Sequence, residues 1–212
     1  MILVGIFVAT IVVMIQRFYK NLLSDEGYLM FTLPTKPWKH ITSKLLVSLI
    51  WLAVSGIMAI ISILIIAYDK IFTFEAFIEM KKAIEAFYDY LGASGNIVII
   101  EGLLAIIIGI ISNVLIIYAS IAIGHLFNKH KVLASLGALI GLNTISQIIL
   151  TIISLIPGAI LFPGNISSTN DINAILPYIH TVAWLAIIFS LVLSAGYFVI
   201  TNYILSKHLN LE

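Results

Sequence analysis

The sequence predicts an all-α, polytopic membrane helix bundle of about five spans, and three observations lead to this fold class. Of the 212 residues, 61% are apolar and only 10% are charged, whereas a soluble domain is about 25% charged because it must cover its surface. Five long apolar stretches could cross a bilayer as helices that satisfy their own backbone amides. Lys and Arg are unevenly shared among the connections. We therefore expect a single membrane domain, residues 1–212, in the cell membrane.

The composition also excludes several classes of function. A formal net charge of +1 leaves no basic excess for a nucleic-acid partner. The chain has no cysteine, which rules out thiolate metal sites and cysteine nucleophiles. It has no glycine-rich phosphate loop and no Ser-His-Asp arrangement, so we expect neither an enzyme nor a cofactor. His125 and His130 are five residues apart, on different helix faces, and no carboxylate is spaced to complete a metal site.

The predicted spans follow from apolar runs of about 20 residues, the length that crosses the hydrocarbon core. They are Met1–Gln16, which is short, Leu45–Tyr68, Ile97–Leu126, Val132–Leu161 and Thr181–Leu205. Connections rich in Lys and Arg lie on the cytoplasmic side. These are the first connection, with Arg17, Lys20, Lys36, Lys39 and Lys44, the third, with Lys129 and Lys131, and the C-terminal tail, with Lys207. The N-terminus is therefore predicted outside and the C-terminus in the cytoplasm.

Polar residues at membrane depth are the candidates for a transport path, because each must face protein, water or the interface. Glu101 lies near the outer end of its span, so it either reaches the headgroups or takes part in transport or a proton relay. Asn113 is mid-span and is typical of inter-helix hydrogen bonding. A polar stripe on the fourth span, near two small residues that favour close helix approach, indicates helix packing or a substrate path. The stripe comprises Asn143, Gln147 and Ser154, and the small residues are Gly137 and Gly141.

The two outer connections also contain ordered patterns. In the connection Asp69–Asn96, Thr73 is the expected N-cap of an amphipathic helix, with Glu75 in its first turn. Its apolar stripe comprises Phe74, Phe77, Ile78, Ile84, Phe87, Tyr88 and Leu91. The stripe indicates packing on the membrane surface or a cap over an exit path. The connection Pro157–Pro177 is partly apolar and too short to span, which predicts a re-entrant or interfacial piece.

The first cytoplasmic connection, residues 17–44, is the most informative. Apolar residues recur at near-helical spacing, which predicts an amphipathic segment along the inner membrane surface; they are Phe18, Leu22, Leu29 and Leu33. Pro34 and Pro37 are expected to stop one helix and start the next, because proline lacks an amide donor and fixes φ. The segment is either a linker that lies on lipid or a docking element for a soluble partner.

Within this connection, residues 25–46 read DEGYLMFTLPTKPWKHITSKLL. The segment resembles the loop between the second and third spans of type-2 ABC exporter permeases, and uncharacterised permease-like proteins of anaerobic Gram-positive bacteria are similar. In that loop an acidic residue precedes a leucine-rich turn, a "TLP" step, a short polar stretch and a lysine that opens the next helix. Here the corresponding positions are Glu26, Thr32–Pro34, Thr35–His40 and Lys44.

The resemblance implies a six-span subunit with both ends in the cytoplasm, so we expect that the first span of the family pattern is absent here. It also implies re-entrant outer helices before the last span, which suits Pro157–Pro177. The long outer helix departs from the family pattern. The implied partners are a second permease subunit and a separate ABC ATPase subunit. The implied contacts of the coupling loop with the ATPase are Asp25, Glu26, Gly27, Tyr28, Met30, Phe31, Leu33 and Pro34.

The resemblance therefore predicts an exporter permease, and two other classes of function remain open. A membrane scaffold or regulator that transports nothing would use the amphipathic loop only to lie on lipid. An ion-coupled secondary transporter would use Glu101. The source of energy separates the three, because an exporter needs an ATPase, a secondary transporter needs an ion gradient and a scaffold needs neither.

Overall fold

The structure is a computed structural model that describes residues 5, 8–10, 12–13, 15–16, 36–68, 73–127, 129–161 and 172–207. The first predicted span is described only at scattered positions. The whole predicted coupling segment lies outside the described residues, including Asp25, Glu26, Gly27, Tyr28, Met30, Phe31, Leu33 and Pro34. The structure therefore bears on the four later spans and on the outer helix.

The described chain is all-α, as predicted. Its elements are α3 (Pro37–Ile66), α5 (Phe74–Leu91), the short 3-10 helix η1 (Gly92–Ser94), α6 (Gly95–Gly124), α7 (Lys131–Leu161) and α8 (Ile172–Lys207). Four of these helices, α3, α6, α7 and α8, are long and apolar enough to cross a membrane. They coincide with the second to fifth predicted spans, so four of the five predicted spans are confirmed as candidate spans.

Two helices, α3 and α8, begin eight and nine residues earlier than the apolar pattern predicts. Helix α3 starts at Pro37, eight residues before the predicted Leu45, because proline suits the first helical position, where an amide donor is not needed. Its 30 residues are about 45 Å long, more than the hydrocarbon core, so its first turns reach the interface. Helix α8 starts at Ile172 and contains Pro177, so both ends of the predicted re-entrant connection are helical.

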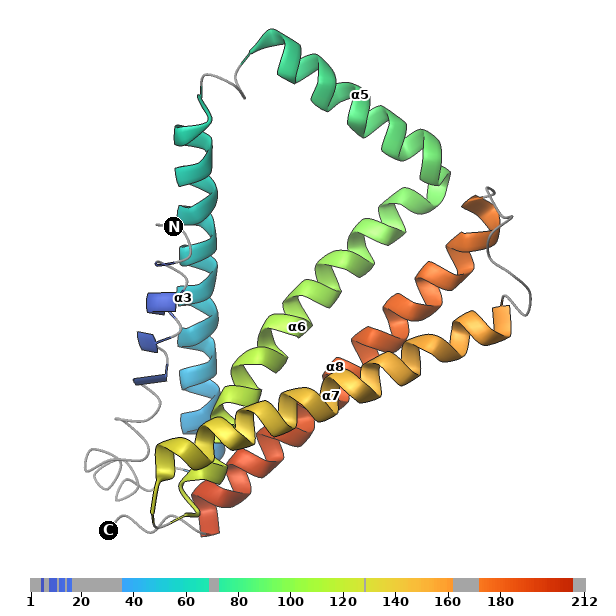
Figure 1. The fold of residues 1–212 in the computed structure, drawn as a ribbon. Coiled ribbons are helices and arrows are strands. Elements are labelled where there is room, and N and C mark those ends of the chain that lie inside the picture. The colour runs from blue at the N-terminus through green and yellow to red at the C-terminus, as the bar shows by residue number, and fades with distance from the viewer. Residues whose placement is uncertain are drawn as a thin grey trace.

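The helices converge at one end of the bundle and diverge at the other (Figure 1). The start of α3, the turn between α6 and α7, and the end of α8 lie at the convergent end. Helix α5 crosses the divergent end and joins α3 to η1 and α6. We call the convergent end the inner end and the other the outer end, in keeping with the orientation predicted from the basic residues. Helices α6 and α8 run in the same direction, with the antiparallel α7 against both.

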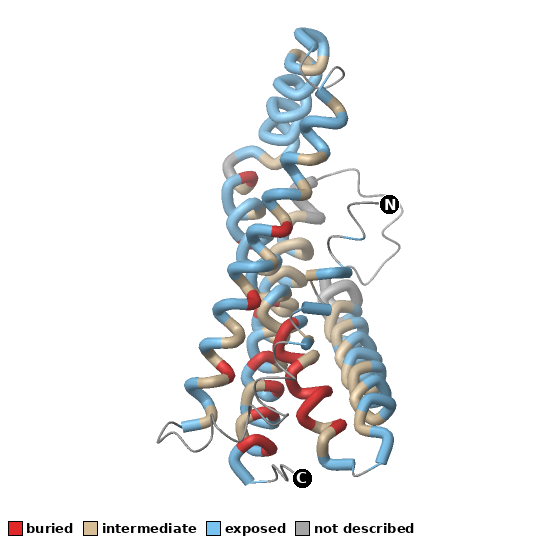
Figure 2. Tube along the Cα trace, turned by 90° about the vertical axis from the view of Figure 1, so that its left-hand side faces the viewer, coloured by how far each residue is buried: buried red, intermediate tan, exposed pale blue. Residues whose placement is uncertain are grey.

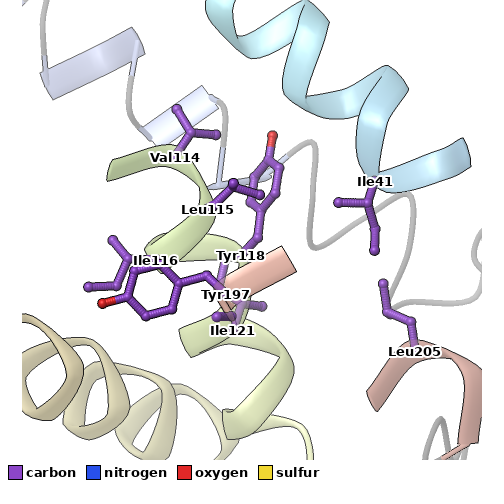
Figure 3. Packing of buried hydrophobic residues seen from close by; sticks show 9 residues of the cluster. Ile41, Val114, Leu115, Ile116, Tyr118, Ile121, Tyr197 and Leu205 are labelled. Atoms are coloured by element: carbon purple, nitrogen blue, oxygen red, sulfur yellow. The ribbon is translucent and has the colours of Figure 1, made fainter. Parts of the chain in front are cut away.

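The core lies near the inner end, where buried residues gather on α6 and α8 (Figure 2). Tyr118 on α6 is its largest fully buried side chain. The other members of the cluster are Ile41, Val114, Leu115, Ile116, Ala119, Ile121, Tyr197 and Leu205 (Figure 3). Ile41 is fully buried, although it belongs to the first turns of α3. The beginning of α3 is thus packed into the same core as the end of α8.

Two tyrosine–serine hydrogen bonds tie the helices together around this core. The hydroxyls of Ser48 on α3 and Tyr118 on α6 are 2.7 Å apart and buried. The hydroxyls of Ser146 on α7 and Tyr197 on α8 are 2.6 Å apart. A hydroxyl within a membrane bundle must find a polar partner, and here each tyrosine finds one across a helix interface. Because the serine of each bond belongs to a different helix, the two bonds hold α3 and α7 to the central α6–α8 pair.

The remaining surface of the long helices is strongly apolar. The most apolar stretch of α7 contains no buried residue, and α3 buries only Ile41, Ser48 and Ser55. Large side chains such as Ile50, Ile65 and Ile140 are more than half exposed. An apolar surface of this extent on every long helix is suited to lipid and to neighbouring membrane subunits rather than to water.

Helix α5 confirms the amphipathic helix predicted in the connection Asp69–Asn96. It covers Phe74–Leu91, and the hydroxyl of its N-cap Thr73 accepts a hydrogen bond from the Ala76 amide at 3.2 Å. Glu75 lies in its first turn, as predicted. None of its residues is buried, and it contacts η1 and the start of α6. Its aromatic stripe is consequently available to the surface of the membrane.

Candidate functional site

The most distinctive polar contact in the described membrane segments joins α6 to α8 near their outer ends. Glu101 on α6 is only 3% exposed. Its Oε2 lies 2.7 Å from Nδ1 of His180 on α8, 79 residues later in the chain. Taking a carboxylate out of water costs several kcal/mol unless it is paired and hydrogen-bonded. The imidazole supplies the partner that makes this position tolerable for Glu101.

The surroundings of Glu101 differ from those of a side chain that reaches outward from the helix end. Glu101 is the seventh residue of α6, close enough to the helix start for a long side chain to have reached the headgroups. Instead, its carboxylate is enclosed between α6 and α8 and is bonded to His180. The contact makes Glu101 part of the helix interface, with a titratable partner within hydrogen-bond distance.

The sequence pattern did not single out His180, because it placed this residue just before the fifth span. Helix α8 begins at Ile172, nine residues before the predicted start at Thr181, and so includes His180. The available signal was depth, since Glu101 lies four residues after the start of its predicted span and His180 lies directly before the start of the fifth. A carboxylate and an imidazole at similar depth are candidates for an intramembrane pair.

Asn113 does not bridge helices in the described chain. Its side chain is exposed, and its amide donates to the Gly109 carbonyl of the same helix at 2.8 Å. The inter-helix hydrogen bonding expected of this residue is carried instead by Tyr118 and Tyr197. Tyrosine hydroxyls can reach across an interface, whereas the Asn113 amide is satisfied by a carbonyl one turn away.

In the structure, the three residues of the predicted polar stripe on α7 do not share one environment. Asn143 and Gln147 are exposed, whereas Ser154 is half-buried and donates to the Thr151 carbonyl at 2.8 Å. Ser154 and Thr151 line a recess of about 230 Å³ between α7 and α8. Its other walls are Leu150, Ile153, Val182, Leu185 and Ala186. The recess is therefore mainly apolar, and Asn143 and Gln147 are outside it.

The expected close approach at Gly137 and Gly141 is wrong within the described chain. A Cβ added at either glycine would meet no atom within 4 Å. The close approach occurs at Gly124, where a Cβ would lie 2.7 Å from the Ser135 amide nitrogen and 2.8 Å from the Lys131 carbonyl oxygen. Only glycine allows the end of α6 to lie this close to the start of α7.

The turn between α6 and α7 contains the two histidines. Among the described residues, no group of three or more His, Cys, Asp or Glu side chains could hold a metal ion. His125 follows the end of α6, and burial lowers the pKa of its imidazole, with a further lowering from the Lys131 ammonium. His130 has a positive φ of 60° in the turn that leads into α7.

The described fold defines a multi-pass membrane protein with four candidate transmembrane helices. The chain matches no protein-family model, no curated protein and no solved structure. What the protein does is therefore argued from its own residues and their geometry.

Proposed function

We propose that this protein is the membrane-spanning permease subunit of an ATP-driven ABC exporter. The observation that carries the proposal is the segment at residues 25–46, with its acidic start, its TLP step and the lysine of the next helix. In this proposal the chain forms part of the translocation path. ATP binding and hydrolysis belong to a separate ATPase subunit on the cytoplasmic side, and this chain needs no cofactor of its own.

The packing of α3 supports a mechanical role for that segment. The helix starts at Pro37, directly after the loop, and Ile41 in its second turn is fully buried in the core. Two turns further along, Ser48 is hydrogen-bonded to Tyr118 of α6. A force applied to residues 25–34 would therefore reach α6 through the first turns of α3 and the buried contacts of Ile41 and Ser48. Close-packed interfaces of this kind respond by switching between discrete arrangements.

The charge distribution supports the orientation that the proposal requires. Basic residues gather at the inner end, where the loop precedes α3; they are Lys36, Lys39, Lys129, Lys131 and Lys207. At the outer end, α5 carries four carboxylates against two lysines, Lys81 and Lys82. Lys and Arg favour the cytoplasmic side, so residues 25–34 and the C-terminus would both be accessible to a cytoplasmic ATPase.

The exposed apolar faces support assembly with a second permease subunit. Helix α7 buries nothing along its most apolar stretch, and α3 packs mainly through its inner half. Within the described residues, two long helices therefore keep exposed apolar faces, and a paired subunit together with lipid would cover them. In the loop, we assign Asp25 and Glu26 to basic groups of the ATPase, and Tyr28, Met30 and Phe31 to an apolar groove on it.

The first experiment is gentle purification from the native membrane, followed by mass spectrometry of the chains that are recovered together. We expect a soluble ATPase with a phosphate-binding loop, and we expect it to be lost when residues 26–31 are scrambled. The matched control is a scramble of residues 79–84 on the outer helix, which also keeps the composition and lies on the other side of the membrane in this proposal. Recovery of the protein alone, under conditions that preserve known complexes, would refute the proposal and favour a scaffold.

A second variant tests coupling rather than binding. Replacing Glu26 with Lys is expected to separate ATPase activity from transport in a reconstituted complex, because the acidic contact becomes repulsive. Unchanged coupling in Glu26→Lys vesicles, with Glu79→Lys measured beside them, would remove the assignment of residues 25–34 as the coupling element.

One observation favours a second candidate, an ion-coupled secondary transporter. The buried pair of Glu101 and His180 is the kind of intramembrane titratable contact that proton-driven carriers use. Uptake or efflux by vesicles driven by a proton gradient without ATP, and abolished by Glu101→Gln, would establish this candidate. Transport that requires ATP and persists without the gradient would exclude it.

A further inference from the structure

Helix α7 carries a regular row of exposed side chains along one side. The members of this row, which we call the α7 seam, are Leu133, Leu136, Ile140, Asn143 and Gln147. They follow one another at spacings of three, four, three and four residues, the heptad spacing of a helix that packs along its length against a second helix. Leu139 and Leu142 of the same helix pack against the core, so the seam lies on a different side of α7 from its contacts within the chain.

Two members of the seam are carboxamides near the middle of the helix. Asn143 and Gln147 are the thirteenth and seventeenth of the 31 residues of α7. At a rise of about 1.5 Å per residue, each lies roughly 18 Å or more from both helix ends. The hydrocarbon core of a bilayer is about 30 Å thick, so a helix that spans it holds both amides in its interior, beyond the reach of the headgroups.

Within the described chain, the side chains of Asn143 and Gln147 form no hydrogen bond. The bond from the Thr151 hydroxyl, at 2.8 Å, goes to the backbone carbonyl of Gln147 and leaves its carboxamide unpaired. Asn113 on α6 shows how such a group can be satisfied, because its amide donates to the Gly109 carbonyl of its own helix at 2.8 Å. An unpaired amide in hydrocarbon is costly, so the two seam amides need a partner from outside the chain.

A second copy of this chain offers a partner with matching chemistry. Two copies inserted in the same orientation are related by a two-fold axis along the membrane normal, which places each seam residue opposite its counterpart at the same depth. A carboxamide has both N–H donors and a C=O acceptor, so it is complementary to an identical group. Residues 132–161 contain no charged side chain, so no like-charge repulsion within the span opposes the pairing of two copies.

We propose that this protein forms a dimer through the α7 seam, in which the Asn143 and Gln147 side chains of one copy hydrogen-bond to those of the other. Leu133, Leu136 and Ile140 pack between the two helices toward the inner end. The amides fix the register of the pair, as a single buried asparagine does in coiled coils. The inference rests on the proposed function only in making the paired subunit a second copy of this chain. Its test involves no ATPase, so the contact and the exporter assignment can fail separately.

The absence of cysteine allows the seam to be tested with single cysteines in the native membrane. Ile140→Cys places a thiol in the seam, and Ile145→Cys places one on another side of the same helix; both native side chains are more than half exposed. After mild oxidation we expect a disulfide-linked dimer for Ile140→Cys and little or none for Ile145→Cys, with mass spectrometry identifying both linked chains. Equal cross-linking at the two positions, no cross-linking at Ile140→Cys, or a link to a different membrane protein overturns the proposal.

The contribution of the amides is measured in the Ile140→Cys background with the purified full chain in lipid vesicles. Replacing both Asn143 and Gln147 with Leu removes the hydrogen bonds and leaves side chains that suit lipid. We expect association, followed as the cross-linked fraction on dilution with lipid, to weaken about fivefold or more. The matched control, Asn113→Leu, removes an exposed amide that is bonded to its own helix and should leave association unchanged. Undiminished association in the double variant overturns the pairing of the amides, and the comparison of Ile140→Cys with Ile145→Cys does not depend on the folding of that variant.

Discussion

Ser48 on α3 and Tyr118 on α6 are 70 residues apart in the chain, yet their hydroxyl groups share a buried hydrogen bond of 2.7 Å. Around this bond the inner ends of the helices close into a core, with Ile41 and Leu205 as neighbours in the same cluster (Figure 3). The bond joins the helix that follows the proposed coupling loop to the most buried helix of the bundle. Any movement of α3 at its inner end therefore involves Tyr118.

Removing either partner of this bond should destabilise the bundle, and removing both should cost less than the sum of the two single changes. Hydrogen bonds within membrane bundles contribute about 0.6 kcal/mol on average and up to about 1.7 kcal/mol. We expect Tyr118→Phe to cost about 1 kcal/mol in unfolding free energy, and the double variant with Ser48→Ala to cost less than the sum of the single changes. Ser62→Ala, at an exposed serine bonded to its own helix, is the control and should be close to neutral. Additive single and double changes in mixed-micelle denaturation would contradict the bond.

Gly124 and Gly137 should respond in opposite directions to replacement by alanine. At Gly124 the new Cβ would collide with the backbone of Ser135 and Lys131, and such overpacking costs about 1 to 3 kcal/mol. At Gly137 nothing lies within 4 Å, and alanine is favoured over glycine inside a helix by up to about 1 kcal/mol. Thermal unfolding in detergent should therefore show a lowered midpoint for Gly124→Ala and an equal or higher midpoint for Gly137→Ala. The same response at both sites would mean that α6 and α7 do not approach at Gly124.

His125 should make the stability of the protein sensitive to acid. Burial, followed by the charge of Lys131, holds the pKa of its imidazole in the folded chain below the ordinary value of about 6.5. The unfolded chain therefore binds this proton more readily. The contribution of neutral His125 is complete above about pH 6.5 and is lost as the pH falls from there toward the folded-state pKa.

The variant His125→Gln isolates this contribution. We expect the unfolding midpoint of the variant to fall less between pH 7.5 and pH 5 than that of the wild type. His130→Gln removes the neighbouring imidazole and serves as the control, with the wild-type pH dependence retained. Parallel curves for wild type and His125→Gln would show that its environment does not disfavour the charged imidazole.

The outer helix α5 should lie with its aromatic stripe in the membrane interface. Phe77 is 59% exposed and belongs to the stripe, whereas Glu79 lies on the opposite face. An environment-sensitive dye attached to Phe77→Cys should report a less polar environment in vesicles than the same dye on Glu79→Cys. The pair is matched because both positions are exposed and lie in the same turn of the helix. Equal spectra at the two positions would show that α5 does not lie along the lipid surface.

Several features of this protein follow from local chemistry and were accessible from sequence. Lipid offers no hydrogen-bond partners, so backbone N–H and C=O groups within it must bond to one another. Apolar runs such as Ile97–Leu126 therefore form helices, and α6 covers nearly the same residues. The N-cap of α5 at Thr73 and the start of α3 at Pro37 are also local, because each depends on a few neighbouring residues. For the candidate site, the sequence located Glu101 as an acid inside a span and left its partner undetermined.

What the sequence by itself determined was the set of apolar helices, the amphipathic outer helix and the end of the bundle that carries the basic residues. Tertiary structure alone decided that Glu101 meets His180, that Tyr118 meets Ser48, and that Gly124 rather than Gly137 is the point of closest approach. The physical reason is the distance along the chain over which each feature is determined. Helix formation in lipid depends on residues within a turn or two, whereas these contacts depend on which faces of distant helices pack together, and many faces here are equally apolar.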